Sequence, residues 1–376
     1  MSQFASDHAQ RVVGLYGDPT VSWSILLEAR LGNVLAPEKA AERLRAATER
    51  YAHLGAPPLI EQVPAAELPA VRDRFAAAPY DRGAPLIRVA VSADEPAVLI
   101  AAHHGAVDGL GLLAVLGLVL DVPITSGATG IGARTADESF LLSALRRLAE
   151  ALFAPPARIS PDRGILVSSG AKPQAPAGGQ APLDPPREVY GDVFATRHEP
   201  RMRLGAAAFV AAAARTTEAW NRAHGRKTAR VVAALGASRR GGAAPEPEPG
   251  STFFRLRLTE EPSADDVSRI LAGRHPEPDF PARSSRIARL GTRLLASRLG
   301  STYLMSNLGA VSAGDLVLSI AFYPAASGRS GVAFGAATVG DTSTLTIRAR
   351  RKDFDATAAG RLVDEFVRSV RGQDSR

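Results

Sequence analysis

The stretch His103-His104-Gly105-Ala106-Val107-Asp108-Gly109 decides the fold, because it places two histidines, a carboxylate and a turn glycine between apolar segments. Residues 85–92 and 97–102 are typical of two short apolar strands, and residues 110–120 are typical of an apolar helix. Adjacent residues of a strand point to opposite faces, so if one histidine reaches a cavity, its neighbour faces the packed interior. The sequence therefore predicts a strand, a turn and a helix, with the histidines where the strand ends.

These residue types suit acyl transfer. A histidine of near-neutral pKa takes a proton from an attacking amine or hydroxyl and returns it to the leaving group. Asp108 is too far along an extended chain to touch the second histidine, so we interpret it as structural. Gly109 permits the backbone conformation of the strand-to-helix turn. Taken on its own, the histidine pair is equally consistent with packing.

A metal site is not supported by the remaining residues. The chain has no cysteine, and the other histidines lack the spacing of metal ligands. Those histidines are His8, His53, His198, His224 and His275.

The pattern His-His-x-x-x-Asp-Gly resembles the signature of the CoA-dependent acyltransferase superfamily, which includes chloramphenicol acetyltransferase, polyketide-associated acyltransferases and nonribosomal peptide condensation domains. Residues 303–311 look like the Ser-Asn-Leu-Gly strand of condensation-type members, and strand-like segments follow at 316–323, 331–335 and 344–348. The Asp-Phe-Gly-Trp-Gly motif of the plant BAHD branch is absent. The resemblance implies a two-lobed α/β (α+β), chloramphenicol acetyltransferase-like fold, each lobe a mixed sheet flanked by helices, with an active-site tunnel between the lobes.

The resemblance also assigns roles to residues of the motif. The matching positions are His103, His104, Asp108 and Gly109. His104 matches the catalytic histidine, and Asp108 matches the aspartate that orders the motif through an arginine. Because a buried carboxylate without a cation is costly, we expect Arg88, or otherwise Arg30, to be its partner.

Ser306 and Asn307 match a strand that lines the tunnel in members of the superfamily. Asn307 is expected to donate a hydrogen bond to the substrate or to the oxyanion. An ordinary strand end is the alternative interpretation of the same residues.

The resemblance implies no permanently bound cofactor and no metal. It implies a co-substrate, either acyl-CoA or a phosphopantetheinyl acyl or peptidyl carrier protein, and a small-molecule amine or hydroxyl acceptor. Two alternatives stay open: cyclisation or condensation of a carrier-bound intermediate with the same histidine as proton shuttle, and a non-catalytic binding homologue. The Ala, Arg, Gly and Pro bias suggests a high-GC bacterium and, by analogy, specialised metabolism.

The length of 376 residues and the 45% hydrophobic content suit two cores. We expect an N-terminal lobe over 1–153, a Pro/Gly/Ala-rich linker or loop over 154–187, and a C-terminal lobe over 188–376. Strands are also expected at 21–30, 59–63, 230–236 and 253–258. Helices are expected at 37–54, 65–77, 137–153, 206–224, 264–273, 283–299 and 356–371.

The formal charge of +7 is spread along the chain with acidic residues interspersed, which argues against a nucleic-acid partner. The densest basic patches, Arg226-Lys227, Arg239-Arg240 and residues 348–352, are candidates for attracting CoA phosphates or an acidic carrier protein, or are solvated surface. The Gly/Pro-rich residues 241–250 predict an exposed loop near the cleft. No apolar segment is long enough to span a membrane and the N-terminus is no signal peptide, so a cytoplasmic protein is expected.

Overall fold

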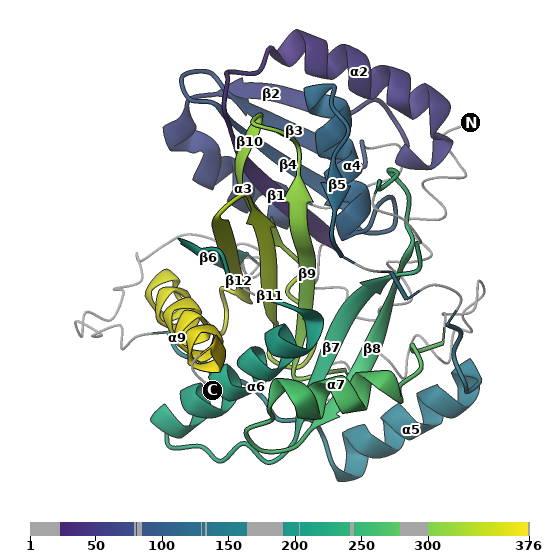
Figure 1. Ribbon diagram of the computed structural model, residues 1–376, viewed down its shortest axis with the longest axis vertical. Coiled ribbons are helices and arrows are strands. Elements are labelled where there is room, and N and C mark those ends of the chain that lie inside the picture. Colours follow the sequence, from purple (N-terminus) through teal and green to yellow (C-terminus); the bar gives the residue numbers. More distant parts are fainter. Residues whose placement is uncertain are drawn as a thin grey trace, which may run out of the picture.

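The computed structural model describes residues 23–78, 80, 85–128, 130–131, 134–163, 191–202, 204–240, 244–278 and 300–374. Its strands form two mixed sheets, one in each half of the molecule, and helices flank both (Figure 1). This confirms the predicted two-lobed architecture.

The first sheet has the strand order β10-β1-β4-β3-β2, with β2 and β3 parallel and the other pairs antiparallel. Its strands are β1 (Ser24–Leu31), β2 (Leu59–Val63), β3 (Ile87–Ser92), β4 (Ala97–His103) and β10 (Val317–Tyr323). Short 3-10 turns cover Ala52–Leu54 and Ala65–Glu67. Strands β3 and β4 are buried over nearly their whole length. This explains why their sequences are continuously apolar and do not alternate between apolar and polar residues.

Three helices cover the first sheet: α2 (Pro37–Arg50), α3 (Leu68–Ala77) and α4 (Gly109–Leu120). The first begins with proline, whose missing N–H is no loss in the first turn, and buries Leu44 against α4 and the sheet. The third is apolar on all sides, because it lies between α2 and the sheet. The helix α3 packs through Phe75 into a separate cluster with Leu26 and Leu99.

The second sheet has the order β6-β12-β11-β9-β7-β8, and the short β5 pairs with β9. Its strands are β5 (Thr125–Ser126), β6 (Asp192–Pro200), β7 (Val231–Ser238), β8 (Ser251–Leu258), β9 (Tyr303–Ser312), β11 (Val332–Val339) and β12 (Thr342–Arg350). Helices α6 (Ala206–Ala223) and α9 (Ala356–Asp374) pack on it, with Phe209, Phe334 and Phe366 in edge-on or tilted contact. The helices α5 (Phe140–Phe153) and α7 (Ala264–Ala272) lie further toward β8 (Figure 1).

The two sheets exchange strands across the middle of the chain. The strand β10 leaves the C-terminal half and pairs with β1 of the first sheet, while β5 pairs with β9 of the second. Residues 154–163 also join the second half, where the Ile159 N–H donates to Ser330 Oγ at 2.9 Å and Ser160 bonds Asn221. The rest of the expected linker, residues 164–187, and the expected helix 283–299 lie outside the described residues.

Strand β6 and helix α5 differ in part from what the sequence predicted. The strand β6 was not predicted, because its residues are mostly half-buried and alternate weakly. The amphipathic helix α5 buries Ser143 and Ala151, whereas Leu141, Leu142 and Leu145 on its apolar side are 68%, 56% and 55% exposed. Among the helices of the described residues, none is long and apolar enough to cross a membrane.

Candidate active site

The histidine motif lies at the junction of β4 and α4, as predicted. The strand ends at His103, and α4 begins at Gly109. The backbone N–H groups of Ala106 and Val107 donate to the His103 carbonyl at 2.8 and 3.3 Å, which closes the turn. The His104 N–H donates to the Trp23 carbonyl at 2.8 Å, so the start of β1 holds the turn from the side.

The two imidazoles face different surroundings. The His103 ring is buried, accepts the Gly105 N–H at Nδ1 over 3.0 Å, and stands edge-on to Tyr80 with ring centroids 5.0 Å apart. The His104 ring is only half-buried, and its Nδ1 lies 3.2 Å from the Val107 carbonyl oxygen. Because a carbonyl only accepts hydrogen bonds, Nδ1 of His104 carries the proton and donates. In the neutral ring, Nε2 of His104 is therefore the unprotonated nitrogen that can take a proton from a substrate.

Asp108 organises the turn from a buried position. Its carboxylate is 2% exposed and caps α4 by accepting the Gly111 N–H at 2.7 Å. It also accepts the Gly250 N–H at 3.1 Å and forms an ion pair with Arg240 at 3.0 Å. One side chain thus joins the motif to the end of β7 and the start of β8 in the second sheet.

The prediction that Arg88 or Arg30 pairs with Asp108 was wrong. Arg88 extends to the other side of its strand, donates to the Phe75 and Ala78 carbonyls at 3.3 and 3.1 Å, and lies over the Tyr80 ring at 4.1 Å. Arg30 is mostly exposed and lies 3.9 Å from Glu95. The residue that neutralises Asp108 is Arg240, which the sequence singled out only as part of a basic patch.

The loop between β7 and β8 is anchored on the motif. Arg240 donates to the carbonyls of Glu246 and Glu248, and the Asp108 N–H points at the Glu248 carbonyl, 3.5 Å away. His53 donates through Nε2 to the Pro247 carbonyl at 2.6 Å. A Cβ on Gly111 would stand 2.8 Å from the Glu248 oxygen, so glycine is needed where the loop meets α4. The described part of this loop, residues 244–250, is partly exposed and also fixed in place.

Gly109 has a different role from the predicted one. Its backbone is not left-handed; instead, a Cβ there would stand 3.0 Å from Leu308 Cδ2 and 3.1 Å from Phe322 Cζ. The side chains of β9 and β10 approach the first turn of α4 closely here, and a methyl group at this position would need Leu308 or Phe322 to shift by a few tenths of an ångström.

Ser306 and Asn307 lie on β9, next to the Leu308 that contacts the start of α4. The Asn307 amide donates to the Leu204 carbonyl at 2.7 Å, and its oxygen accepts the Gly309 N–H at 2.8 Å. Ser306 is half-buried and lies opposite Gly236 of β7. These two contacts of Asn307 are structural and leave one N–H of its amide for another acceptor.

A buried arginine contacts the strand that pairs with the end of β4. Arg348 of β12 is 1% exposed, pairs with Asp192 at 2.6 Å and donates to the Ser24 carbonyl at 2.5 Å. Ser24 is the register partner of His103 in the first sheet. Of the predicted basic patches, Arg348 is thus buried and Arg240 half-buried, whereas Arg239, Arg351, Lys352 and Arg226-Lys227 are exposed.

Sequence reasoning missed Arg240, Arg348 and Gly111 as parts of the site. The one signal for Arg240 was its position immediately before a Gly/Pro-rich loop that was expected near the cleft. Neither Arg348 nor Gly111 carries a signal that a single sequence reveals.

No family model matches the chain, and no curated protein matches it. Solved structures do match over nearly its whole length. The starter condensation domain of the rhizomide synthetase RzmA, as a variant in complex with C8-CoA, matches with a TM-score of 0.59 at 14% identity, covering 98% of this chain and 94% of that one. A further variant, in complex with C8-CoA and Leu-SNAC, matches with a TM-score of 0.56 at 15% identity, covering 100% and 94%. The chain therefore has the two-lobed, chloramphenicol acetyltransferase-like fold of condensation domains.

Proposed function

We propose that the protein is an acyltransferase that moves an acyl group from a thioester donor to an amine or hydroxyl acceptor, with His104 as general base. The observation that carries the proposal is the hydrogen bond from His104 Nδ1 to the Val107 carbonyl, which leaves Nε2 of the neutral ring as the proton acceptor. The Asp108–Arg240 pair supports it, because it fixes the turn that orients the ring.

The chemistry needs one proton relay. Nε2 of His104 takes the proton of the acceptor as its nitrogen or oxygen attacks the thioester carbonyl. The tetrahedral oxyanion then collapses, the C–S bond breaks, and His104 returns the proton to the departing thiolate. The remaining amide N–H of Asn307 or nearby backbone N–H groups stabilise the oxyanion. His103, which accepts a backbone N–H of the turn, positions the loop and does not touch substrate.

The donor and the acceptor are proposed from the ligands of proteins with the same fold. The starter condensation domain of similar structure was solved with C8-CoA and with Leu-SNAC. We assign to this chain an acyl-CoA or a phosphopantetheinyl carrier protein as donor, and a small-molecule acceptor that meets it in a tunnel between the lobes. A cytoplasmic role in bacterial specialised metabolism agrees with these substrates.

The test is mass spectrometry of products after incubation with a panel of acyl-CoAs and acyl carrier proteins, plus simple amines and alcohols. The wild type, His104→Ala and His104→Gln are compared. His198→Gln, at an exposed histidine of β6 whose Nδ1 contacts Thr344, is the control. Acylated acceptor and free thiol are expected from wild type and control, with turnover lowered about a hundredfold or more in both His104 variants.

Three results separate the alternatives. Full activity of His104→Ala overturns the mechanism. Release of a cyclised or condensed product from a carrier, without acyl transfer to the added acceptor, identifies the condensation alternative. Binding of acyl-CoA with no thiol released by any variant identifies a non-catalytic binder.

A further inference from the structure

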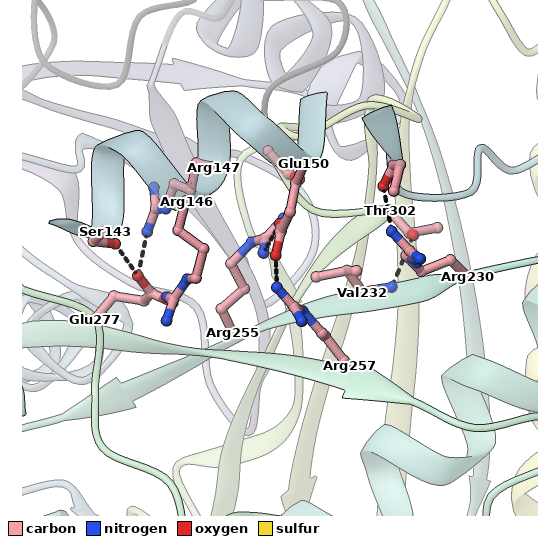
Figure 2. Close-up of polar contacts among 12 residues, drawn as sticks. Ser143, Arg146, Arg147, Glu150, Arg230, Val232, Arg255, Arg257, Glu277 and Thr302 are labelled. Atoms are coloured by element: carbon pink, nitrogen blue, oxygen red, sulfur yellow. Dashed lines mark hydrogen bonds and ion pairs between the residues drawn. The ribbon is translucent and has the colours of Figure 1, made fainter. Parts of the chain in front are cut away.

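Arginines of helix α5 and of strand β8 face one another (Figure 2), and Arg274, which follows α7, lines a cavity together with them. We call this the arginine pocket, and its cations are Arg146 and Arg147 of α5, Arg255 and Arg257 of β8, and Arg274 after α7. Two cavities of about 70 and 60 Å³ lie among them and share Arg146, Arg255, Arg274 and Glu277 as lining residues, and Arg257 also lines the larger one.

The buried Glu277 is already satisfied by the side chains around it. It accepts from Ser143 Oγ at 2.8 Å and from Arg147 at 2.7 Å, and it lies 3.3 Å from Arg146 (Figure 2). Arg146 also pairs with Glu138 at 2.7 Å. Burial alone would raise the pKa of Glu277, yet Arg147 and the hydrogen bonds hold that pKa below its usual range. Glu277 is therefore an ionised carboxylate that already neutralises other arginines.

The second carboxylate at the pocket, Glu150, is shared between two cations. It pairs with both Arg255 and Arg257, which rise toward α5 from the strand below (Figure 2). Arg255 also donates to the Gly300 carbonyl at 3.0 Å. Arg274 lines both cavities, and among the described residues it has no ion pair at all.

Among the described residues of the arginine pocket, positive charges therefore outnumber negative ones, and the pocket is partly buried. Burial, followed by the fields of Arg147, Arg146 and Arg274, lowers the pKa of Arg255 to about 10. The exposed Asp137 lies at the rim of the smaller cavity, where solvent screens it. Within the described part of the chain, Nε of Arg146 and Nε of Arg147 are buried without a hydrogen-bond acceptor. Buried donors without an acceptor and buried cations without a counter-charge destabilise the fold unless an anion binds to them.

We propose that the arginine pocket binds a phosphate group. A cavity of about 70 Å³ holds several water-sized probes and so accommodates a tetrahedral oxyanion. Guanidinium groups bind phosphate through charge-assisted forks, and its several oxygens accept donors from α5, β8 and the turn after α7 together. A phosphate group offers more acceptor oxygens than a carboxylate, and these point in tetrahedral directions, so it can use donors from α5, β8 and the turn after α7 at the same time. Nothing in this proposal depends on the chemistry of His104.

The test is isothermal titration of the purified protein with inorganic phosphate at constant ionic strength, with thermal unfolding in phosphate and in chloride. The decisive variant is Arg274→Gln, because it removes the cation that has no ion pair. Arg45→Gln, an exposed arginine of α2 on the other half, is the matched control. Acetate at the same ionic strength controls for a general carboxylate effect.

We expect phosphate, but not acetate, to raise the Tm of the wild type and of the control. Arg274→Gln is expected to bind phosphate tenfold more weakly or worse, since it lacks a charge-assisted contact. Its Tm without phosphate is expected not to fall, because the removed charge repels Arg255 and Arg257. A purely structural arginine would instead lower that Tm. If Arg274→Gln does not fold, the half-exposed Arg257→Gln replaces it with the same expectation for binding.

Equal phosphate affinity in wild type and variant, or a wild-type Tm that is the same in phosphate and chloride, overturns the proposal. A second titration compares adenosine 3′-phosphate with inorganic phosphate. Tighter binding of the nucleotide identifies a phosphate monoester of a larger ligand as the occupant. Equal binding identifies free phosphate.

Discussion

The Asp108–Arg240 pair allows the link between the two sheets to be measured. Removing one partner of a buried ion pair costs about 3–5 kcal/mol when the other charge is left alone. Here the carboxylate of Asp108 keeps two backbone N–H donors, and the Arg240 side chain is 16% exposed. We therefore expect Arg240→Met to lower the free energy of unfolding by about 2–3 kcal/mol.

Asp108→Asn keeps an oxygen for the helix cap and leaves Arg240 with two carbonyl acceptors. We expect it to cost about 1–2 kcal/mol. In the double variant no buried carboxylate lacks its cation, so the two costs should not add. The expected coupling energy is about 1–2 kcal/mol.

The assay is urea unfolding followed by tryptophan fluorescence and far-UV circular dichroism. Trp23 reports on the first half and Trp220 on the second, since both are 5% exposed. The control cycle combines Asp108→Asn with Arg88→Met and should give a coupling near zero. A coupling below about 0.5 kcal/mol in the Arg240 cycle would refute the reasoning, because independent sites add within that margin.

Three further outcomes follow from the contacts described above. Gly111→Ala should destabilise the protein by about 1–3 kcal/mol, because its methyl group overlaps a carbonyl of the β7–β8 loop, whereas Gly372→Ala, with open space around it, should not; thermal unfolding compares them. Asn307→Ala should cost about 1–2 kcal/mol through its two backbone contacts, and a loss of turnover larger than the loss of folded protein would mark a role in the reaction. Glu277→Gln should destabilise the protein at neutral pH. Because the pKa of Glu277 is depressed in the folded state, the ionised carboxylate contributes fully to the free energy of unfolding above an unfolded-state pKa of about 4.3, and this contribution is lost as the pH falls through the folded-state pKa. Urea unfolding from pH 7 to 3 should therefore show the free energies of unfolding of wild type and variant converging at low pH.

The sequence was sufficient to predict those elements whose pattern depends on neighbouring residues in the chain. The apolar strand ending at His103, the helix from Gly109 and the proline at the start of α2 follow from short-range periodicity and turn chemistry, and the structure confirms each. The resemblance carried by the histidine motif and by residues 303–311 supplied the two-lobed fold, which neither length nor composition specifies.

The sequence was insufficient where a contact joins distant residues. Arg240 lies far along the chain from Asp108, and its position before a Gly/Pro-rich loop does not identify it as the partner of that carboxylate. Arg88, on the neighbouring strand, was a reasonable choice by proximity, but its guanidinium finds carbonyl acceptors on α3 and after it. Periodicity likewise predicted two faces for α5 without saying that the polar one, with Ser143, faces the protein.

The position of β10 has a consequence for how the chain is made. Among the described strands, β1 pairs on one side with β4 and on the other side with β10, which follows much later in the sequence. At about 5–20 residues per second, a ribosome exposes that backbone edge for roughly tens of seconds before its partner emerges. An open edge of apolar strand is a template for pairing with other chains. The first sheet is thus begun long before its last strand is made, so a chain that stalls between β4 and β10 would be prone to aggregate.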